Sequence, residues 1–249
     1  MKPYFPKLII LWILFYIKDM AASDSEIVTI IAGVRATPGE YPWHVILKRF
    51  REDLLLCGGS VISSTWVLTV AHCIVDLESV FLQFGTVEIF SNAPGMTSMR
   101  LIIHPTYNPY YPPQSDDVGL IELPTPLTFN TFIQPIPLVN TEEAAINDFI
   151  GAISFMSGYG FYNDKTRRYS PWLLWGAEEV VNNSVCAARY GQPKDSQMCT
   201  IGYTADRQHP CNGDSGGALV WRNSMRTLKQ IGIYSYGGFL NVQNSLQLI

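Results

Sequence analysis

Residues 57–73 read CGGSVISSTWVLTVAHC, and this stretch carries the clearest signal for the fold. Its apolar run at 61–70 is short and ends just before His72. Comparable short runs lie on both sides of it, at 44–47, 80–84, 101–103, 118–123, 152–155, 218–221 and 231–234. Turn-forming residues separate these runs, at 37–40, 91–95 and 105–113. Many short apolar runs divided by Gly and Pro are typical of a β-sandwich or barrel, so we predict an all-β fold.

The composition supports a folded domain. Of the 249 residues, 47% are hydrophobic and 15% are charged, which excludes a disordered chain. The net charge is -4 and no run of Lys or Arg is long enough for a nucleic-acid surface. Helix signals are few, and only 141–145 and 184–189 suggest a turn or two each.

The N-terminal segment has the layout of a secretory signal peptide. Lys2 and Lys7 give it a positive start, the apolar run covers residues 8–17, and small residues follow at 21–23. A membrane-spanning helix needs about 20 apolar residues, so this run is too short to be an anchor. We therefore expect a signal peptide at 1–22 and a secreted protein whose mature form has no membrane segment.

Two residues suggest hydrolysis by an activated serine. Such chemistry needs a base for the hydroxyl proton, an acid that orients the base, and donors for the oxyanion. The chain has four histidines, and His72 lies at the end of an apolar strand, before Cys73. Ser215 lies within Gly-Asp-Ser-Gly-Gly at 213–217, where glycines permit a tight turn and the amides of Gly213 and Ser215 could face one oxygen.

Other polar residues have plainer interpretations. We interpret His44 as a packed strand residue and His104 as a loop or strand-end residue. Metal-binding patterns such as HExxH or paired CxxC are absent from the sequence, so we predict no metal site and no cofactor. Asn182-Asn183-Ser184 is a sequon for N-linked glycosylation.

Five segments together resemble the chymotrypsin/trypsin family of secreted serine endopeptidases. They are IIAGVRATPGEYPW from residue 30, CGGSVISSTWVLTVAHC from 57, DVGLIEL from 117, CNGDSGGALV from 211 and IYSYGG from 233. The resemblance covers about residues 30–238. It implies two six-stranded antiparallel β-barrels, an activation peptide at 23–29 and a peptidase domain at 30–249. It also implies a C-terminally shortened member, so we expect the last strand and the C-terminal helix to be missing.

The resemblance assigns roles to particular residues. His72 would be the general base, Asp117 its orienting acid, with Asp116 as a solvated loop neighbour, and Ser215 the nucleophile. The amides of Gly213 and Ser215 would form the oxyanion hole.

Residues 235–237, which are Ser235, Tyr236 and Gly237, would pair with the substrate backbone. His209 would form the base of the specificity pocket, where the absence of Asp argues against a preference for Lys or Arg. Cleavage after Thr29 would free the amine of Ile30 to pair with Asp214.

The cysteines and the partners follow from the same resemblance. Cys57 would pair with Cys73 and Cys186 with Cys199, which leaves Cys211 unpaired. The expected partners are protein or peptide substrates and protease inhibitors, and the expected state is a monomer. The main hypothesis is an active endopeptidase made as a zymogen. The alternative is a catalytically impaired, protease-like protein that binds or regulates.

Overall fold

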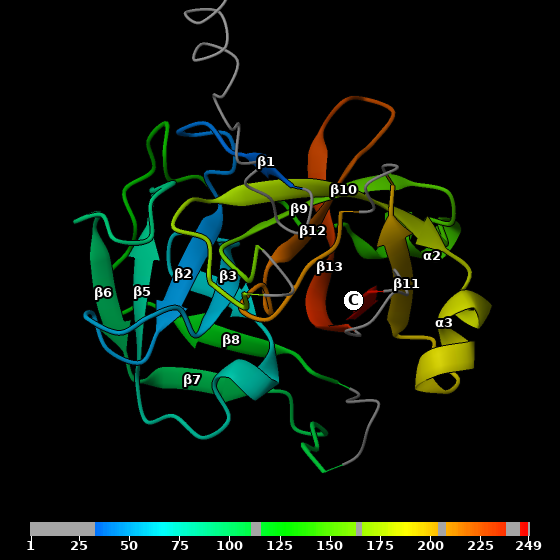
Figure 1. Ribbon diagram of the computed structural model, residues 1–249, viewed down its shortest axis with the longest axis horizontal. Coiled ribbons are helices and arrows are strands. Elements are labelled where there is room, and N and C mark those ends of the chain that lie inside the picture. The colour runs from blue at the N-terminus through cyan, green and yellow to red at the C-terminus, as the bar shows by residue number, and fades with distance from the viewer. Residues whose placement is uncertain (1–32, 111–115, 163–165, 204–207, 238–244, 249) are drawn as a thin grey trace, which may run out of the picture.

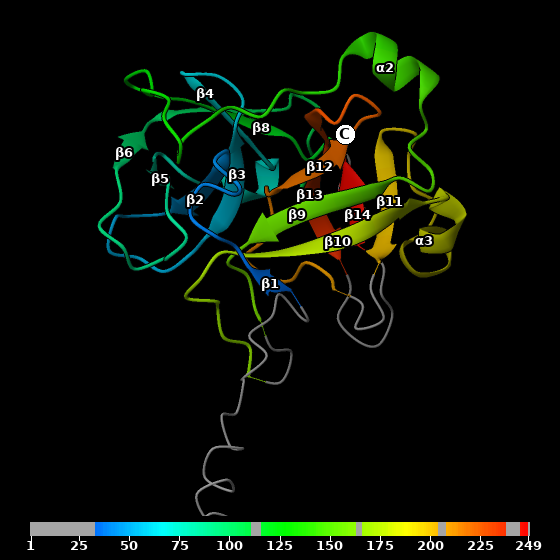
Figure 2. The same ribbon diagram turned by 90° about the horizontal axis from the view of Figure 1, so that it is seen from above.

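Two antiparallel β-sheets, each curled into a barrel, lie side by side in the computed structural model (Figures 1 and 2). The structure describes residues 33–110, 116–162, 166–203, 208–237 and 245–248. None of the helices in these ranges is long and apolar enough to cross a membrane. The predicted signal peptide and activation peptide lie outside the described residues.

The first sheet closes on itself through a bend between two short strands. Its order is β6-β5-β2-β3-β4-β8-β7. The strands are β2 (His44–Lys48), β3 (Cys57–Val61), β4 (Trp66–Thr69), β5 (Val80–Phe84), β6 (Gly95–Ser98), β7 (Arg100–Ile103) and β8 (Gly119–Glu122). Because Met99 alone separates β6 from β7, one bent segment joins the two ends of the sheet. Counted as one strand, this segment gives the predicted six-stranded barrel.

The second sheet closes through direct pairing of β9 with β10. Its order is β1-β10-β11-β14-β13-β12-β9, and β10 also pairs with β9. The strands are β1 (Val34–Arg35), β9 (Ile153–Gly158), β10 (Leu174–Val181), β11 (Gln197–Gly202), β12 (Ala218–Arg222), β13 (Leu228–Gly237) and β14 (Ser245–Leu248). Six strands form the closed ring, and β1 adds to the outside of β10. The predicted two-barrel architecture is therefore confirmed.

One part of the fold prediction is wrong. We expected the last strand to be missing, but β14 lies between β11 and β13 and pairs with both. Its sequence, Ser-Leu-Gln-Leu, alternates polar and apolar residues as a strand does. Without β14, the facing edges of β11 and β13 would lose their hydrogen-bonding partners.

The helices are short, as predicted. α2 (Thr141–Ile146) begins at Asn140, whose side chain forms a capping box with Glu143. α3 (Asn183–Tyr190) begins at Asn182, and the single turn η1 (Ala71–Cys73) follows β4. Both α-helices lie on the second barrel, on the side away from the first (Figures 1 and 2).

Apolar side chains fill the first barrel and the seam between the barrels. Val45, Leu47, Leu82 and Ile121 are among the buried residues of the first core. A second cluster at the seam includes Ile46 from β2 and Tyr159 from the turn after β9. The seam is the place where residues of both barrels come together, and the candidate site lies along it.

Candidate active site

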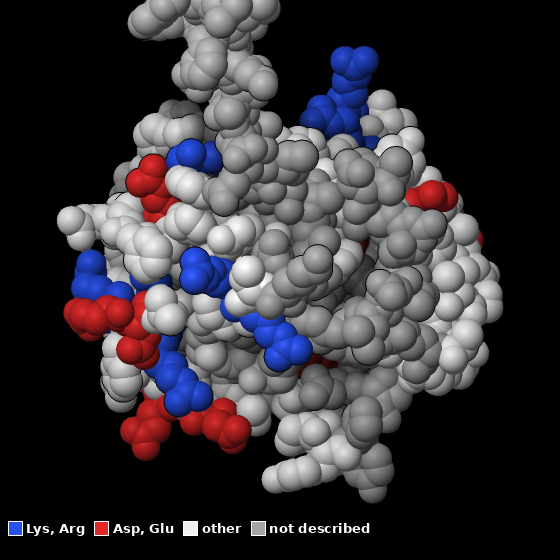
Figure 3. Space-filling model, in the orientation of Figure 1, with Lys and Arg blue, Asp and Glu red and all other residues white. Residues whose placement is uncertain are grey.

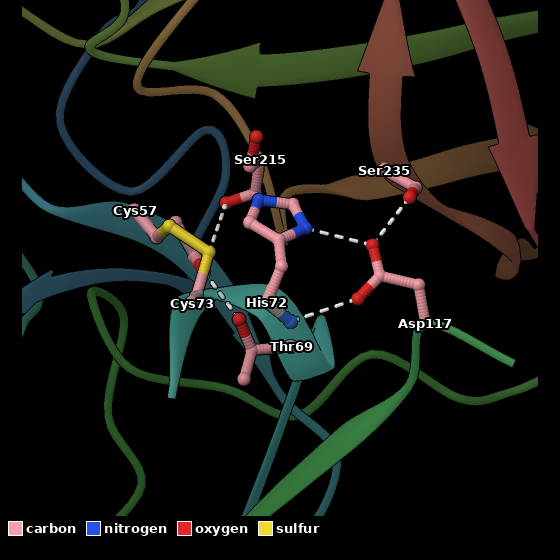
Figure 4. Close-up of a disulfide and its surroundings, with 8 residues drawn as sticks. Cys57, Thr69, His72, Cys73, Asp117, Ser215 and Ser235 are labelled. Carbon is pink, nitrogen blue, oxygen red and sulfur yellow. Dashed lines mark hydrogen bonds and ion pairs between the residues drawn. A yellow bond between two sulfur atoms is a disulfide. The ribbon is translucent and has the colours of Figure 1, made fainter. Parts of the chain in front are cut away.

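His72 and Asp117 come from neighbouring strands of the first barrel. β4 pairs with β8 in a register that places Thr69 opposite Gly119, so the residues just beyond these ends lie close together. His72 is in η1 after β4, and Asp117 directly precedes the segment leading into β8. The Nδ1 atom of His72 lies 2.7 Å from Asp117 Oδ2, and the backbone amide of His72 donates to Oδ1 at 2.8 Å. Asp117 therefore holds the imidazole at two points (Figure 4).

Asp116, the neighbouring carboxylate, forms its hydrogen bond with a residue other than His72. It adopts a positive φ of 59° and accepts a hydrogen bond from the hydroxyl of Thr106 at 2.8 Å. Thr106 also lies 3.0 Å from Nδ1 of His104. Asp116 is thus a loop residue with its own partner, in keeping with its predicted role beside Asp117.

Asp117 is fully buried and remains an anion through its hydrogen bonds. Its relative exposure is 0%. Burial alone raises the pKa of Asp117, but the hydrogen bond and charge of His72, together with the hydroxyl of Ser235, bring this pKa below its ordinary value. A buried anion next to Nδ1 favours the tautomer in which Nδ1 carries the proton, which leaves Nε2 as a free base.

The hydroxyl of Ser235 has a role that the sequence analysis missed. Ser235 lies in β13, is 2% exposed, and donates a short hydrogen bond to Asp117 Oδ2. We had expected Ser235 only as part of the edge that binds substrate backbone. A signal was present, because a serine within a buried apolar strand needs a hydrogen-bonding partner.

Ser215 lies in a tight loop before β12, and its carbonyl oxygen lies 3.9 Å from the sulfur of Cys73, the residue that follows His72 (Figure 4). Glycines with positive φ flank Ser215, with φ of 99° at Gly213 and 86° at Gly216. The carbonyl of Ser215 accepts a hydrogen bond from the amide of Gly58 at 2.7 Å, and the hydroxyl of Thr69 donates to the carbonyl of Gly58 at 2.9 Å. The first barrel thus holds the loop of the second. Within the described residues, the hydroxyl of Ser215 makes no hydrogen bond to His72.

Two backbone amides in this loop are available as donors. Among the described residues, the amides of Gly213 and Ser215 make no hydrogen bond, whereas the amide of Asp214 donates to the carbonyl of Cys211 at 3.0 Å. Gly213 packs so tightly that an added Cβ would lie 2.7 Å from Tyr169 and 2.8 Å from Leu55. This loop is therefore fixed while two donors remain for a ligand.

The carboxylate of Asp214 points into the second barrel. It is 0% exposed and accepts hydrogen bonds from the amides of Gly160 at 2.7 Å and Cys211 at 2.8 Å. Burial raises the pKa of Asp214 to about 7, although these two hydrogen bonds oppose the shift. Its predicted partner, Ile30, lies outside the described residues.

The predicted substrate edge is exposed on one side. Tyr236 and Gly237 pair with β14, but β12 accompanies β13 only as far as Ile233. Among the described strands, none pairs with the other edge of β13 at residues 235–237. His209 is half-buried, and its Nδ1 lies 3.0 Å from the carbonyl oxygen of Pro210.

The cysteines behave as expected. Cys57 is bonded to Cys73 and Cys186 to Cys199, while Cys211 is buried and forms no disulfide within the described residues. In the described part of the chain, the one grouping with metal-ligand spacing is Cys57, His72 and Cys73. Its two sulfurs are joined in a disulfide, so they offer no thiolate ligands to a metal.

Comparison with known proteins agrees with this geometry. The family described as Trypsin matches residues 30–247 of the chain. A venom protease of Bombus pensylvanicus is 31% identical over 219 residues, which cover 84% of this chain and 88% of that protein. Transmembrane protease serine 9 of Rattus norvegicus is 32% identical over 215 residues, covering 84% of this chain and 20% of that protein. Coagulation factor IX of Oryctolagus cuniculus is 28% identical over 207 residues, covering 82% and 74% respectively.

Proposed function

This chain belongs to the trypsin family of serine proteases, and from that premise we propose that it is a secreted serine endopeptidase. Its substrates are proteins or peptides, and His72, Asp117 and Ser215 carry the reaction. The observation that supports this most is the contact of His72 Nδ1 with the buried Asp117, together with the contact of the Ser215 carbonyl with Cys73, the residue next to His72. The family's chemistry uses these side chains and needs no cofactor.

The proposed mechanism passes one proton through His72. The hydroxyl oxygen of Ser215 attacks the substrate carbonyl carbon while its proton moves to His72 Nε2. The negative oxygen that forms is bound by the amides of Gly213 and Ser215. The loss of one such donor typically costs about 2.7–4 kcal/mol of barrier. His72 then gives its proton to the departing amine, and water hydrolyses the acyl-enzyme by the reverse sequence of proton transfers.

We propose that the protein is made as a zymogen. Cleavage between Thr29 and Ile30 would free an amine for the buried carboxylate of Asp214. A cation there would lower the pKa of Asp214 from its raised value near 7, and thereby stabilise the anion beside Ser215. N-terminal sequencing of the secreted protein tests this step. A mature start at Ile30 is expected, and another start would contradict it.

The substrate backbone is proposed to bind along residues 235–237 as an added strand. His209 at the base of the side-chain pocket supplies no fixed negative charge, so cleavage after apolar or aromatic residues is expected. Profiling with a peptide library tests this preference. Cleavage mainly after Lys or Arg would overturn it.

A hydrolysis assay tests the function itself. The chain, cut before Ile30, is incubated with an unfolded protein substrate, and the new N-termini are counted. We expect hydrolysis by the unmodified chain and by Ser224→Ala, an exposed control, and none by Ser215→Ala. If the correctly cut chain is folded but produces no new termini, the alternative of a protease-like binding or regulatory protein is favoured instead.

A further inference from the structure

The chain contains one sequon, Asn182-Asn183-Ser184, and the structure places it on the surface at the start of α3. Asn182 is exposed, and its Oδ1 atom accepts a hydrogen bond from the amide of Ser184 at 2.9 Å. No hydrogen bond from its Nδ2 atom is found among the described residues. The nitrogen that would be modified is therefore free, while the oxygen already has its partner.

The next residue, Asn183, differs from Asn182 because both polar atoms of its side chain form hydrogen bonds. Asn183 is half-buried; its Nδ2 atom donates to the carbonyl of Gln197 at 2.8 Å, and its Oδ1 atom accepts from the amide of Cys199 at 3.1 Å. These two bonds tie the helix start to β11. They fix the backbone at 183 so that the side chain of Asn182 faces outward.

Asn182 lines a groove on the surface of the described structure. This groove has a volume of about 840 Å³ and runs between the end of α2, the end of β10 and the start of α3. Its lining includes Ile146 and Ile150, which are 82% and 51% exposed. Asn182 and these two exposed aliphatic side chains line the same groove, so a sugar attached to Asn182 would lie within the groove that they share.

We propose that Asn182 carries an N-linked glycan whose first sugars cover the groove lined by Ile146 and Ile150. The proposal rests on the proposed secretion, because the sugar donor, a lipid-linked oligosaccharide diphosphate, is met in the secretory compartment. In the transfer, a bond forms between Nδ2 and C1 of the sugar while the bond from C1 to the diphosphate oxygen breaks. One proton leaves Nδ2, and the lipid diphosphate departs.

The modification is compatible with both the helix and the active site. The Oδ1 atom keeps its lone pairs after transfer, so the hydrogen bond from Ser184 is retained. α3 ends at Tyr190, whose ring packs at 5.8 Å on that of Tyr236 beside the proposed substrate edge. Eight helical residues separate Asn182 from that contact by about 12 Å. A glycan at Asn182 is therefore attached about two turns of helix from that contact, and we expect hydrolysis not to depend on it.

Peptide mass analysis of protein secreted from a eukaryotic cell tests the proposal. The unmodified chain is compared with Ser184→Ala, which destroys the sequon, and with Ser184→Thr, which preserves it. The hydroxyl of Ser184 makes no hydrogen bond among the described residues and the backbone cap survives in both variants, so both should fold. Treatment with an N-glycan amidase should convert Asn182 to Asp in the unmodified chain and in Ser184→Thr, but not in Ser184→Ala.

A second comparison distinguishes a site that is not glycosylated from a chain that is not secreted. The leader at 1–22 is replaced by an unrelated signal peptide. If only the replaced leader yields glycosylated protein, the glycan at Asn182 is supported and the proposed natural secretion is contradicted. If Asn182 is unmodified in protein recovered from the medium with either leader, the glycan proposal is overturned.

Hydrogen exchange tests the covering of the groove. Amides at 144–150 should exchange faster in Ser184→Ala than in the glycosylated chain, while amides of β3, in the other barrel, should exchange equally in both. Equal exchange at 144–150 in a fully glycosylated chain would contradict the placement of the sugars over the groove.

Discussion

At the level of single residues, the proposed proton transfer depends on which nitrogen of His72 carries the proton. The Asp117 carboxylate accepts a hydrogen bond from the proton on Nδ1, so in the proposed mechanism Nε2 is left to accept the proton of Ser215. Asp117→Asn removes the anion and favours the wrong tautomer. We expect the rate of hydrolysis to fall about 10⁴-fold, the magnitude typical of this change in Ser-His-Asp proteases. Steady-state kinetics with a peptide substrate measure it, and Asp116→Asn is the control. A similar small loss for both variants would contradict the assignment.

Ser235 belongs to the same hydrogen-bonded group and is expected to contribute to stability. In Ser235→Ala, the buried Asp117 loses a donor, and a hydrogen bond to a charged group is worth about 1.5–3 kcal/mol. The free energy of unfolding should fall by that amount in urea denaturation at neutral pH. Ser224→Ala should leave it unchanged, since Ser224 is exposed. An unchanged unfolding free energy for Ser235→Ala would show that the contact with Asp117 is not maintained.

His44 is expected to make the protein sensitive to acid. Its ring is buried in the seam, Nδ1 lies 3.2 Å from the hydroxyl of Ser157, and Nε2 has no hydrogen-bonding partner in the part of the chain that the structure describes. Burial lowers the pKa of His44 from 6.5 to about 3. Between these values the unfolded chain binds a proton that the folded chain does not, so stability falls as the pH falls from about 6.5 toward 3.

Replacing His44 isolates this contribution. At pH 4 the protonation of His44 in the unfolded state should cost about 3 kcal/mol of stability relative to pH 7. Urea unfolding of His44→Gln should show a weaker loss between pH 7 and pH 4 by about that amount. The same pH dependence in both proteins would mean that the imidazole is not buried in its neutral form.

At the level of elements, the serine loop fits against β3 and β4 with almost no free space. An added Cβ at Gly216 would lie 2.2 Å from the carbonyl oxygen of Gly58 and 2.3 Å from Thr69 Oγ1. Gly191, at the end of α3, has a similar positive φ of 77°, but nothing lies within 4 Å of its added Cβ. A comparison of alanine substitutions at the two glycines therefore distinguishes the energetic cost of backbone strain from the cost of close packing.

This pair gives a controlled prediction. Gly191→Ala should cost about 1–3 kcal/mol from backbone strain alone, because φ of 77° with ψ of 173° is a conformation that glycine adopts almost exclusively. Gly216→Ala should cost at least about 1–3 kcal/mol more, because the neighbouring backbone must shift. Hydrolysis should fall only in Gly216→Ala, since the shift moves Ser215. Equal unfolding free energies for the two variants would contradict the packing of this loop.

The elements also show which features could be predicted from the sequence. Short apolar runs and turn residues were sufficient for an all-β fold, and the pairing of Cys57 with Cys73 followed from the resemblance to the chymotrypsin/trypsin family. The strand β14 was not predicted, because four residues of alternating polarity are a weak signal by themselves. They form a strand here by pairing with both β11 and β13, which lie on either side of them. The bend at Met99 was missed for a similar reason, since closure of a barrel is a property of the whole sheet.

On the scale of the whole molecule, the candidate site exists only where the two barrels meet. The first barrel supplies His72 and Asp117, and the second supplies Ser215, Ser235 and the free amides. Contacts at the seam, such as that of the Gly58 amide with the carbonyl of Ser215, hold the two sets in register. No single segment contains all of these groups, so the sequence could identify each one but could not place the hydroxyl of Ser235 on Asp117.

The surface of the molecule suggests how it meets its partners. Acidic and basic side chains lie among one another on the face that Figure 3 shows, over the first barrel, without a continuous basic field. The absence of nucleic acid among the partners, which we expect from the net charge of -4, stays a prediction.

The most direct test of the central claim is the mass of the peptide containing Ser215 after reaction with a fluorophosphonate. The reagent forms a covalent bond with a serine oxygen only where a base accepts its proton. For the chain cut before Ile30, we expect an adduct on Ser215 that disappears in His72→Ala and persists in His104→Ala. An unlabelled Ser215 in the folded, correctly cut chain, or a label that remains when His72 is replaced, would contradict it.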